Sequence, residues 1–418
     1  MEIKREQYIN QLEVRRKNGL VKVITGCRRS GKSYLLFKLF KQHLLDNGVE
    51  TEDIIELALD RIENDYLREP HALYEFVSAK IKDPDHYYYV FLDEIQFVER
   101  FEEVLNSLMA RENVDIYVTG SNSKLLSKDI ITEFRGRGDE VKVHSLNFAE
   151  FMSAYQGEVR KGWQEYLTYG GLPRILQLPT DEQKAKYLKD LFEETYLKDI
   201  IERHHLRNPS ELGELVNVLA SAVGSLTNPS KLERTFKSIK GSDISDKTIL
   251  TYIGYLEDAF LINGAMRYDV KGKRYIDTLV KYYFEDVGLR NARLDFRQSE
   301  SNHLMENVIY NELVYRGYSV DVGIVEVTTA EPNGARKRVN LEIDFIATRG
   351  SEKYYIQSAF SMPDSEKIRQ EERPLNSVKD SFKKIIVTGD NVATSRNDKG
   401  IVTFNIIDFL LDSESLRY

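Results

Sequence analysis

The sequence predicts an α/β protein in which a largely parallel sheet comes first and a second α/β domain comes last. Three observations support this prediction. Short apolar runs alternate with amphipathic stretches over the first 150 residues, the middle of the chain reads as mostly helical, and strand patterns return after residue 280. Alternating strands and helices are typical of βαβ units around a parallel sheet. We expect a first domain with the parallel sheet at 1–175, a helical segment at 176–280 and a last domain at 281–418.

Four apolar runs are the expected strands of the first sheet, at residues 20–25, 53–59, 87–94 and 114–120. The stretch between the first two keeps helical spacing of its leucine and phenylalanine residues until Asn47 and Gly48 supply a stop signal. In the last domain, strand patterns at 319–327, 341–347, 353–360 and 383–389 follow one helical pattern. The order of these elements predicts two separate sheets.

The composition is that of an ordinary soluble globular protein, with 41% hydrophobic and 30% charged residues. Because no apolar run approaches the roughly 18 to 20 residues of a membrane-spanning helix, and the first residues lack a secretory signal pattern, we expect a cytoplasmic protein without membrane contact. The single cysteine, Cys27, excludes an intrachain disulfide. The net charge of −8 argues against indiscriminate wrapping of nucleic acid, but it allows a local basic surface.

Residues 21–34, VITGCRRSGKSYLL, contain the spacing G-x-x-x-x-G-K-[ST] of a phosphate-binding loop. In such a loop, glycines let backbone N–H groups surround phosphates, the lysine reaches the β and γ phosphates, and the hydroxyl ligates Mg²⁺. An ordinary glycine turn is the alternative, but the position between a strand and an amphipathic helix argues against it. With no Asn-Lys-x-Asp pattern for guanine, we expect ATP and Mg²⁺. The predicted contacts are Gly26, Cys27, Arg28, Arg29, Ser30, Gly31, Lys32 and Ser33, with Lys32 catalytic and Ser33 a metal ligand.

The acidic pair Asp93 and Glu94 closes the third expected strand. Because this pair follows a run of apolar and aromatic residues, it should emerge at the carboxyl edge of the sheet, where ligands bind in open α/β folds. There Asp93 can hold Mg²⁺ directly or through water, and Glu94 can polarise the attacking water as a general base. Acidic pairs on surfaces are common, but together with the phosphate loop this pair predicts ATP hydrolysis as well as binding.

Polar residues after the fourth strand are further candidates. Ser121 and Asn122 could reach the γ-phosphate or the attacking water, or they could simply cap the next helix. Arg135 and Arg137 lie in a glycine-flanked stretch that could present a guanidinium outward, as an arginine finger requires. Exposed arginines are usually only solvated, so both interpretations stay open. We favour Arg135 as the catalytic arginine.

Five motifs together resemble one known group: TGCRRSGKS, FLDEIQ, VTGSNSKLL, FRGRG and YLTYGGLPRIL. The sequence resembles, over nearly its whole length, the prokaryotic AAA-type ATPases related to the STAND branch of P-loop NTPases. These carry a C-terminal domain of unknown function with a restriction-endonuclease-like core. The resemblance implies that Ser121 is a sensor of the nucleotide and that Arg135 is an arginine finger. Such a finger often acts across a subunit boundary, which would make a second copy of the chain a partner.

Residues 245–276 fit a helix followed by a hairpin, as in a winged-helix module, with Ser245 as the N-cap. The hairpin turn contains three basic residues that could contact DNA phosphates: Lys271, Lys273 and Arg274. The helix has acidic residues near its end and Lys247 as its basic residue, which does not favour reading of bases. Both weak DNA contact and packing against a protein partner stay open.

The last domain resembles the PD-(D/E)XK nuclease core through Glu306, Asp344 and the strand YYIQSAF. Cleavage of a phosphodiester by such a core needs clustered carboxylates for Mg²⁺ and a lysine. Here Gln357 replaces a carboxylate and Ala359 replaces the lysine, so we expect an inactive domain. The whole sequence then predicts an Mg²⁺-dependent ATPase that couples hydrolysis to a change of conformation or assembly, on DNA or without it. A regulatory switch protein without DNA contact and an active DNA nuclease are the alternatives.

Overall fold

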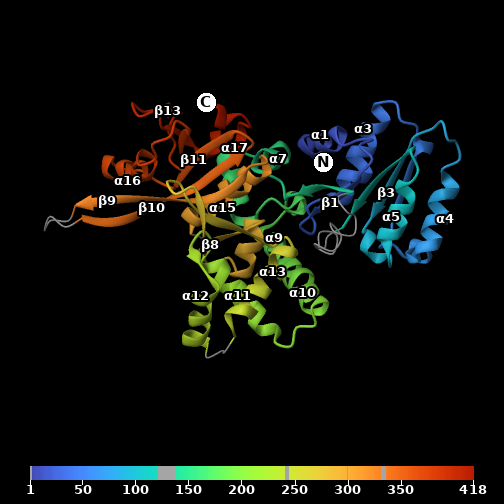
Figure 1. Cartoon of the computed structure of the whole chain (residues 1–418), viewed down its shortest axis with the longest axis horizontal. Coiled ribbons are helices and arrows are strands. Elements are labelled where there is room, and N and C mark those ends of the chain that lie inside the picture. The colour runs from blue at the N-terminus through green and yellow to red at the C-terminus, as the bar shows by residue number, and fades with distance from the viewer. Residues whose placement is uncertain (1, 121–136, 241–243, 299, 331–335) are drawn as a thin grey trace. The chain divides into compact units, whose positions relative to one another are not determined.

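The computed structural model describes residues 2–120, 137–240, 244–298, 300–330 and 336–418 (Figure 1). The chain forms two compact units. The first comprises Met1–Ser145 with Asp258–Phe260, and the second comprises Leu146–Glu257 with Leu261–Tyr418. Within the described ranges, no helix combines the length and the apolar character needed to cross a membrane.

The first unit contains a five-stranded sheet of order β2-β3-β4-β1-β5, in which all neighbouring strands are parallel. Its strands are β1 (Val21–Gly26), β2 (Ile54–Ala58), β3 (Tyr88–Asp93), β4 (Val114–Thr119) and β5 (Gly138–Val143). Its helical elements are α1 (Glu6–Val14), α2 (Lys32–Tyr34), the π-helical η1 (Leu35–Phe40), α3 (Lys41–Asp46), η2 (Thr51–Asp53), η3 (Ile62–Arg68), α4 (Pro70–Lys80), η4 (Ile95–Phe97) and α5 (Phe101–Met109).

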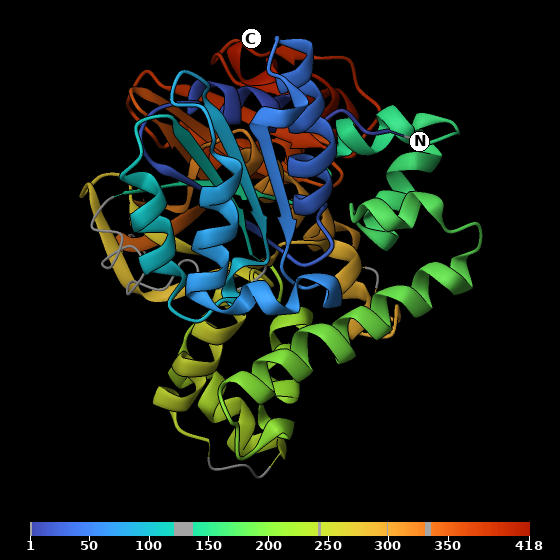
Figure 2. The same cartoon turned by 90° about the vertical axis from the view of Figure 1, so that its right-hand side faces the viewer.

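Helices cover both faces of this sheet, because side chains alternate between the faces along each strand. Val23, Val90 and Val118 belong to the apolar cluster that includes side chains of α4 and α5. On the opposite face, Phe40 of η1 contacts the rings of Phe91 and Tyr117, with centroids 6.0 and 5.1 Å away. Figure 2 shows the strands between the helices. The predicted α/β class and parallel sheet are therefore confirmed.

Strand β5 was not predicted from the sequence. It pairs in parallel with β1, from Val21 opposite Gly138 to Gly26 opposite Val143. Its sequence, GDEVKV, gives a weak strand signal because only two of its six side chains are buried. A sequence with so few apolar residues forms a strand here because its backbone can hydrogen-bond to the free side of β1.

The second unit contains a nine-stranded mixed sheet of order β13-β14-β12-β11-β10-β9-β7-β8-β6. Its strands are β6 (Leu226–Thr227), β7 (Ile262–Asp269), β8 (Arg274–Phe284), β9 (Ser319–Ala330), β10 (Arg336–Arg349), β11 (Glu352–Ala359), β12 (Lys383–Thr388), β13 (Ser395–Arg396) and β14 (Val402–Asn405). Its helical elements are α7 (Phe148–Ala154), α8 (Val159–Tyr169), η6 (Pro173–Gln177), α9 (Asp181–Asp190), η7 (Leu191–Leu197), α10 (Lys198–Arg203), α11 (Pro209–Ser221), α12 (Pro229–Thr235), η8 (Phe236–Lys240), α13 (Asp246–Asp258), α14 (Val287–Arg293), α15 (Ser301–Tyr315), α16 (Ser365–Asn376), α17 (Ile406–Leu411) and η9 (Ser415–Arg417).

The hairpin predicted as a wing and the strands predicted as the last domain share this one sheet. β7 pairs in parallel with β9 and antiparallel with β8. The predicted boundaries at 175 and 280 fall inside η6 and β8, whereas the compact units divide after Ser145. The division into 1–175, 176–280 and 281–418 therefore stays a prediction of the sequence, and the structure groups the chain differently.

A buried ion pair links the two central strands β1 and β4. The ammonium of Lys22 bonds to the carboxylate of Asp115, and these side chains are 0% and 2% exposed. Asp115 also accepts hydrogen bonds from the backbone N–H of Lys17 at 2.9 Å and from the hydroxyl of Tyr117 at 2.8 Å. Burial lowers the pKa of Lys22, and the attraction of Asp115 opposes that change. The charge of each partner is therefore tolerated only while the other is present.

We expect Asp115→Ala to destabilise the first unit by about 3–5 kcal/mol, because it leaves the Lys22 ammonium buried without its counter-ion. Urea denaturation followed by circular dichroism measures this change. The double variant Lys22→Met with Asp115→Leu removes both charges and should recover most of the loss. If the double variant is no more stable than Asp115→Ala, the explanation by an uncompensated charge is wrong.

Candidate nucleotide site

The phosphate loop connects β1 to α2 by a tight turn that only glycine allows at two points. Gly26 has φ 127° and Gly31 has φ 96°, both in the left-handed region. A Cβ atom at Gly26 would lie 2.0 Å from the carbonyl oxygen of Val143 on β5. Cys27 and Ser30 are buried, Arg28 is half-buried, and Arg29 is exposed with φ 66°. The variable positions of the motif thus differ in exposure, while the two glycines fix the path of the backbone.

The side chain of Lys32 folds back over this loop. Its ammonium donates hydrogen bonds to the carbonyl oxygens of Gly26 and Cys27, each at 3.0 Å. Lys32 is 5% exposed, and burial lowers its pKa, while Cys27, Glu94 and Asp93 act in the opposite direction. A buried ammonium that is bonded to neutral carbonyls would gain strongly from an anionic partner. This environment fits a phosphate group at Lys32.

Asp93 lies at the carboxyl end of β3 and connects the loop to the sheet. Its Oδ1 atom accepts a hydrogen bond from Ser33 Oγ at 2.9 Å and a second one from the hydroxyl of Thr119, the last residue of β4. Burial raises the pKa of Asp93, and these two hydrogen bonds oppose that change. A hydroxyl and a carboxylate in contact are the oxygen ligands that Mg²⁺ uses. The two predicted metal ligands are therefore brought together.

Glu94 follows Asp93 with a backbone φ of 52°, which is unusual for a residue with a side chain. Its backbone N–H donates to Thr119 Oγ1 at 3.1 Å, and its carboxylate accepts from the side-chain amide of Gln96. Strained backbone of this kind is found mostly where a side chain must take a defined direction. Thr119 thus bonds to both acidic residues, and it precedes the predicted sensor Ser121 by two positions.

Arg5 is a second contributor that the sequence did not reveal. This residue is 5% exposed, and its guanidinium donates to the carbonyl oxygen of Ser30 at 3.1 Å and to that of His144 at 2.9 Å. It also stacks over the ring of Tyr8 of α1, with 4.6 Å to the centroid. A chain segment that precedes β1 therefore supports the phosphate loop. No motif marks it, and only its buried position shows its role.

The remaining predicted residues of this site have different outcomes. Ser121, Asn122 and Arg135 lie outside the described residues. Arg137 is described, and it precedes β5, where its carbonyl accepts from Val21 N at 2.9 Å and its guanidinium donates to Asn106 at 3.4 Å. Arg137 is exposed beside the edge strand β5, so its role as an arginine finger or as a solvated side chain stays a prediction.

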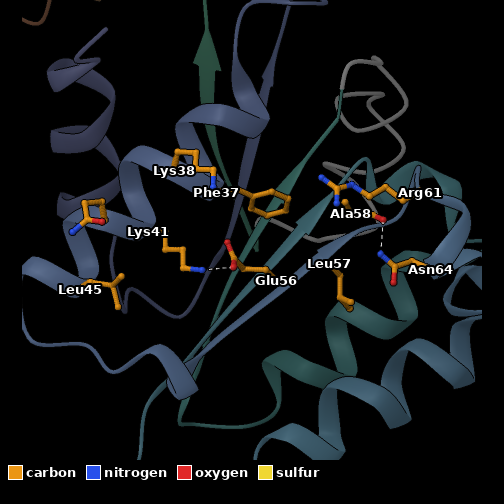
Figure 3. Close-up of a pocket in the computed structure, with 10 residues that line it drawn as sticks. Phe37, Lys38, Lys41, Leu45, Glu56, Leu57, Ala58, Arg61 and Asn64 are labelled. Atoms are coloured by element: carbon orange, nitrogen blue, oxygen red, sulfur yellow. Dashed lines mark hydrogen bonds and ion pairs between the residues drawn. The ribbon is translucent and has the colours of Figure 1, made fainter. Parts of the chain in front are cut away.

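A hollow beside the edge strand β2 is separate from the phosphate loop (Figure 3). Side chains of η1 and α3 line one side of it, and Glu56 and Asn64 lie on the other. Lys41 pairs with Glu56 at 2.5 Å, and Asn64 donates to the carbonyl of Ala58 at 2.8 Å. Because these polar groups already bond to one another and no residue of the motif lines the hollow, it is not the nucleotide site.

Glu306 and Asp344, the two carboxylates expected in a nuclease core, lie together with Glu342 around a buried lysine in the second unit. Lys281 of β8 has its ammonium 2.8 Å from Glu306, 2.8 Å from Glu342 and 3.3 Å from Asp344, and its side chain is 3% exposed. Burial alone would lower the pKa of Lys281, but the three carboxylates outweigh burial and raise it well above its usual range.

Burial also raises the pKa of Glu306 to about 7, Lys281 opposes this change, and Asp344 adds to it. Gln357 is buried beside Asp344, with its side-chain oxygen 3.5 Å from the Asp344 N–H, and Ala359 is buried as well. The position where the resemblance to a nuclease core would place a lysine thus holds a buried alanine, and the lysine beside Glu306 and Asp344 comes from β8. No motif marks Lys281, which stands at the first position of the expected last domain, inside the strand β8 that crosses the expected boundary.

The basic residues of the β7–β8 turn are exposed, and two of them have partners. Lys271 donates to the carbonyl oxygen of Glu326 on β9, and Arg274 lies 3.7 Å from Asp269. Ser245 accepts a hydrogen bond from Thr248 N at 3.2 Å, which confirms the predicted N-cap of α13. The predicted helix and hairpin therefore exist, and the hairpin belongs to the large sheet.

Comparison with known families agrees with this geometry. Residues 18–152 match the model of an AAA domain, and residues 160–300 match that of a domain of unknown function (DUF8612). The first unit thus contains an AAA-type P-loop ATPase domain, for which ATP is the implied ligand. The chain is 34% identical to an uncharacterized protein of Haemophilus influenzae. The similarity extends over 414 residues and covers 98% of each of the two chains. It belongs to the same family as that protein.

More distant similarities extend the comparison. An uncharacterized protein of Methanocaldococcus jannaschii is 28% identical over 423 residues, covering 97% of this chain and 89% of its own length. Among solved structures, the Walker-type ATPase of Pyrococcus abyssi has a TM-score of 0.50 at 16% identity, over 70% of this chain and 96% of that one. This likeness concerns the fold alone. None of these matches is described as a nuclease.

We expect Lys281→Met to destabilise the second unit by about 3–5 kcal/mol, because three carboxylates would then face one another without a cation. Thermal and urea denaturation measure the loss. Lys399→Met, at an exposed position, is the matched control and should change stability little. Adding Glu306→Gln to Lys281→Met should restore part of the stability, and a further loss instead would show that charge repulsion is not the cause.

Proposed function

We propose that this protein is an Mg²⁺-dependent ATPase that uses hydrolysis to change its conformation or its assembly, and that it does so in contact with DNA. The observation that supports hydrolysis best is the contact of Asp93 with both Ser33 and Thr119. It joins the phosphate loop, the acidic strand end and the neighbouring strand end at one point of the sheet. A site that only retained nucleotide would not need a second carboxylate, Glu94, held in strained backbone beside that point.

In this proposal the loop backbone and Lys32 bind the phosphates of ATP. Ser33 and Asp93 would hold Mg²⁺, whose chemistry is to neutralise charge that develops on the phosphate oxygens. Lys32 stabilises the same charge with its ammonium. Glu94 orients and polarises the attacking water and accepts its proton. Thr119 positions both acidic residues, and Arg5 positions the loop.

Two further roles are proposed from the sequence alone. Ser121 would contact the nucleotide as a sensor, and Arg135 would act as an arginine finger, either within the chain or from a second copy. The proposed DNA contact involves Lys271, Lys273 and Arg274 on the exposed β7–β8 turn. A regulatory switch protein without DNA contact is the second candidate, and turnover measured against protein concentration separates the two.

We also propose that the strands around Glu306 and Asp344 are a nuclease-like scaffold without nuclease activity. The ammonium of Lys281 contacts Glu306 and Asp344, the two carboxylates that would hold a divalent cation in such a core, and also Glu342. An active nuclease would use its lysine beside the cation, whereas this lysine lies among the ligands. Incubation of the pure protein with plasmid DNA and Mg²⁺ or Mn²⁺ should leave the DNA uncut.

Glu94→Gln should lower ATP turnover at least 100-fold and leave ATP affinity within about threefold, because the amide cannot accept a proton from water while Lys32 and the loop stay intact. Lys32→Ala should instead lose affinity. Phosphate release measures turnover, and a fluorescent ATP analogue measures binding. Glu99→Gln, an exposed residue six positions after Asp93, is the control and should behave as wild type.

The same assay with and without duplex DNA tests the coupling. Turnover that rises with DNA supports action on DNA, and turnover that responds only to protein concentration supports the switch. If pure wild-type protein binds ATP but hydrolyses none under any of these conditions, the proposal of an ATPase is overturned.

A further inference from the structure

A two-stranded ribbon extends from the sheet of the second unit. β9 pairs with β7 only at Val322–Ile324, and β10 pairs with β11 only at Phe345–Arg349. Between these points and the described ends of the strands, residues 325–330 pair with residues 336–341, and no third described strand pairs with either segment. At about 3.4 Å per residue, this part of the ribbon is roughly 20 Å long. Figure 1 shows β9 and β10 reaching beyond the other elements of the unit.

The outer part of this ribbon is polar and positively charged. Arg336, Lys337 and Arg338 follow one another on β10, and all three are exposed. Opposite them on β9 lie Thr329 and Thr328, paired with Lys337 and Arg338. The inner part is different, since Val325 is buried in the apolar cluster of the sheet. The ribbon is therefore anchored at its base and presents cations and hydroxyls over residues 328–329 and 336–338.

The basic β7–β8 turn lies directly beside the base of the ribbon. The N–H of Val270 donates to the carbonyl of Ile324 on β9 at 3.0 Å, and Lys271 bonds to the carbonyl of Glu326. Two neighbouring hairpins thus place six basic residues on one part of the sheet, against the acidic Asp269 and Glu326. The six are Lys271, Lys273, Arg274, Arg336, Lys337 and Arg338. Such a concentration of positive charge stands out in a chain of net charge −8.

We infer that the β9–β10 ribbon binds double-stranded DNA, entering its major groove while the β7–β8 turn contacts the adjacent phosphates. The major groove of B-form DNA, about 12 Å wide, admits a two-stranded β-ribbon. The deep and narrow major groove of A-form RNA does not admit side chains in this way, which favours DNA over duplex RNA. Arg338 and Asn340 are side-chain types that read base edges, and both are exposed on the ribbon.

This inference deepens the proposed DNA contact and rests on it, but it does not depend on ATP hydrolysis. The two hairpins are tested separately. One double variant is Arg336→Ala with Arg338→Ala on the ribbon, and the other is Lys273→Ala with Arg274→Ala on the turn. The control, Lys186→Ala with Lys198→Ala, removes the same charge from exposed positions on α9 and α10.

Fluorescence anisotropy with a labelled 20-base-pair DNA duplex measures affinity across a series of salt concentrations. The ribbon variant should bind roughly tenfold more weakly or worse, and the plot of log affinity against log salt should be less steep by about 2. The turn variant should lose affinity to a smaller extent, and the control should match wild type. Circular dichroism verifies that each variant stays folded, as expected for exposed positions.

The binding measurements distinguish DNA contact through the ribbon from DNA contact through the turn. If the ribbon variant binds duplex DNA as tightly as wild type while the turn variant does not, the ribbon inference is overturned and the contact through the turn stands. If wild type prefers an RNA duplex of the same sequence, the argument from groove shape is wrong. If wild type binds no DNA at all, both DNA proposals fail, while ATP turnover by wild type and Glu94→Gln still decides the proposed ATPase.

Discussion

The candidate nucleotide site depends on the carboxylate of Asp93, which holds three separate chain segments together. Ser33 belongs to the helix after the loop, Asp93 ends β3, and Thr119 ends β4. Because β3 and β4 are parallel neighbours, their ends reach the same edge of the sheet by geometry alone. The loop reaches that edge because β1 lies on the other side of β4. The contacts of this one buried carboxyl group, whose pKa is raised by burial, therefore depend on the order of the strands in the sheet.

The second unit also buries carboxylates, but it neutralises them with a lysine of the chain. At Asp93 a buried anion bonds to hydroxyl groups and keeps its capacity for a cation. Around Lys281, three carboxylates already have a cation, because the ammonium of Lys281 pairs with each of them. A covalently attached ammonium has a fixed position and cannot exchange. The two carboxylate sites thus differ in availability, although each lies at a strand of an α/β sheet.

Much of this arrangement could be predicted from local sequence, and the rest depends on contacts between distant segments. The phosphate loop and the acidic pair follow from spacing and a strand pattern, so Lys32, Ser33 and Asp93 lie where expected. Strand β5 has too few apolar residues to be recognised, and Arg5 acts only because the segment before β1 returns to the loop. Lys281 could not be identified, because its partners lie 25, 61 and 63 residues further along the chain.

The internal ammonium of Lys281 has a practical consequence for how the protein responds to chelators. A domain held together by a bound divalent ion loses that ion to EDTA and unfolds with it. The carboxylate cluster around Lys281 contains nothing that a chelator could remove. If Ser33 and Asp93 hold Mg²⁺ as proposed, EDTA would remove that ion and leave the Lys281 cluster unchanged.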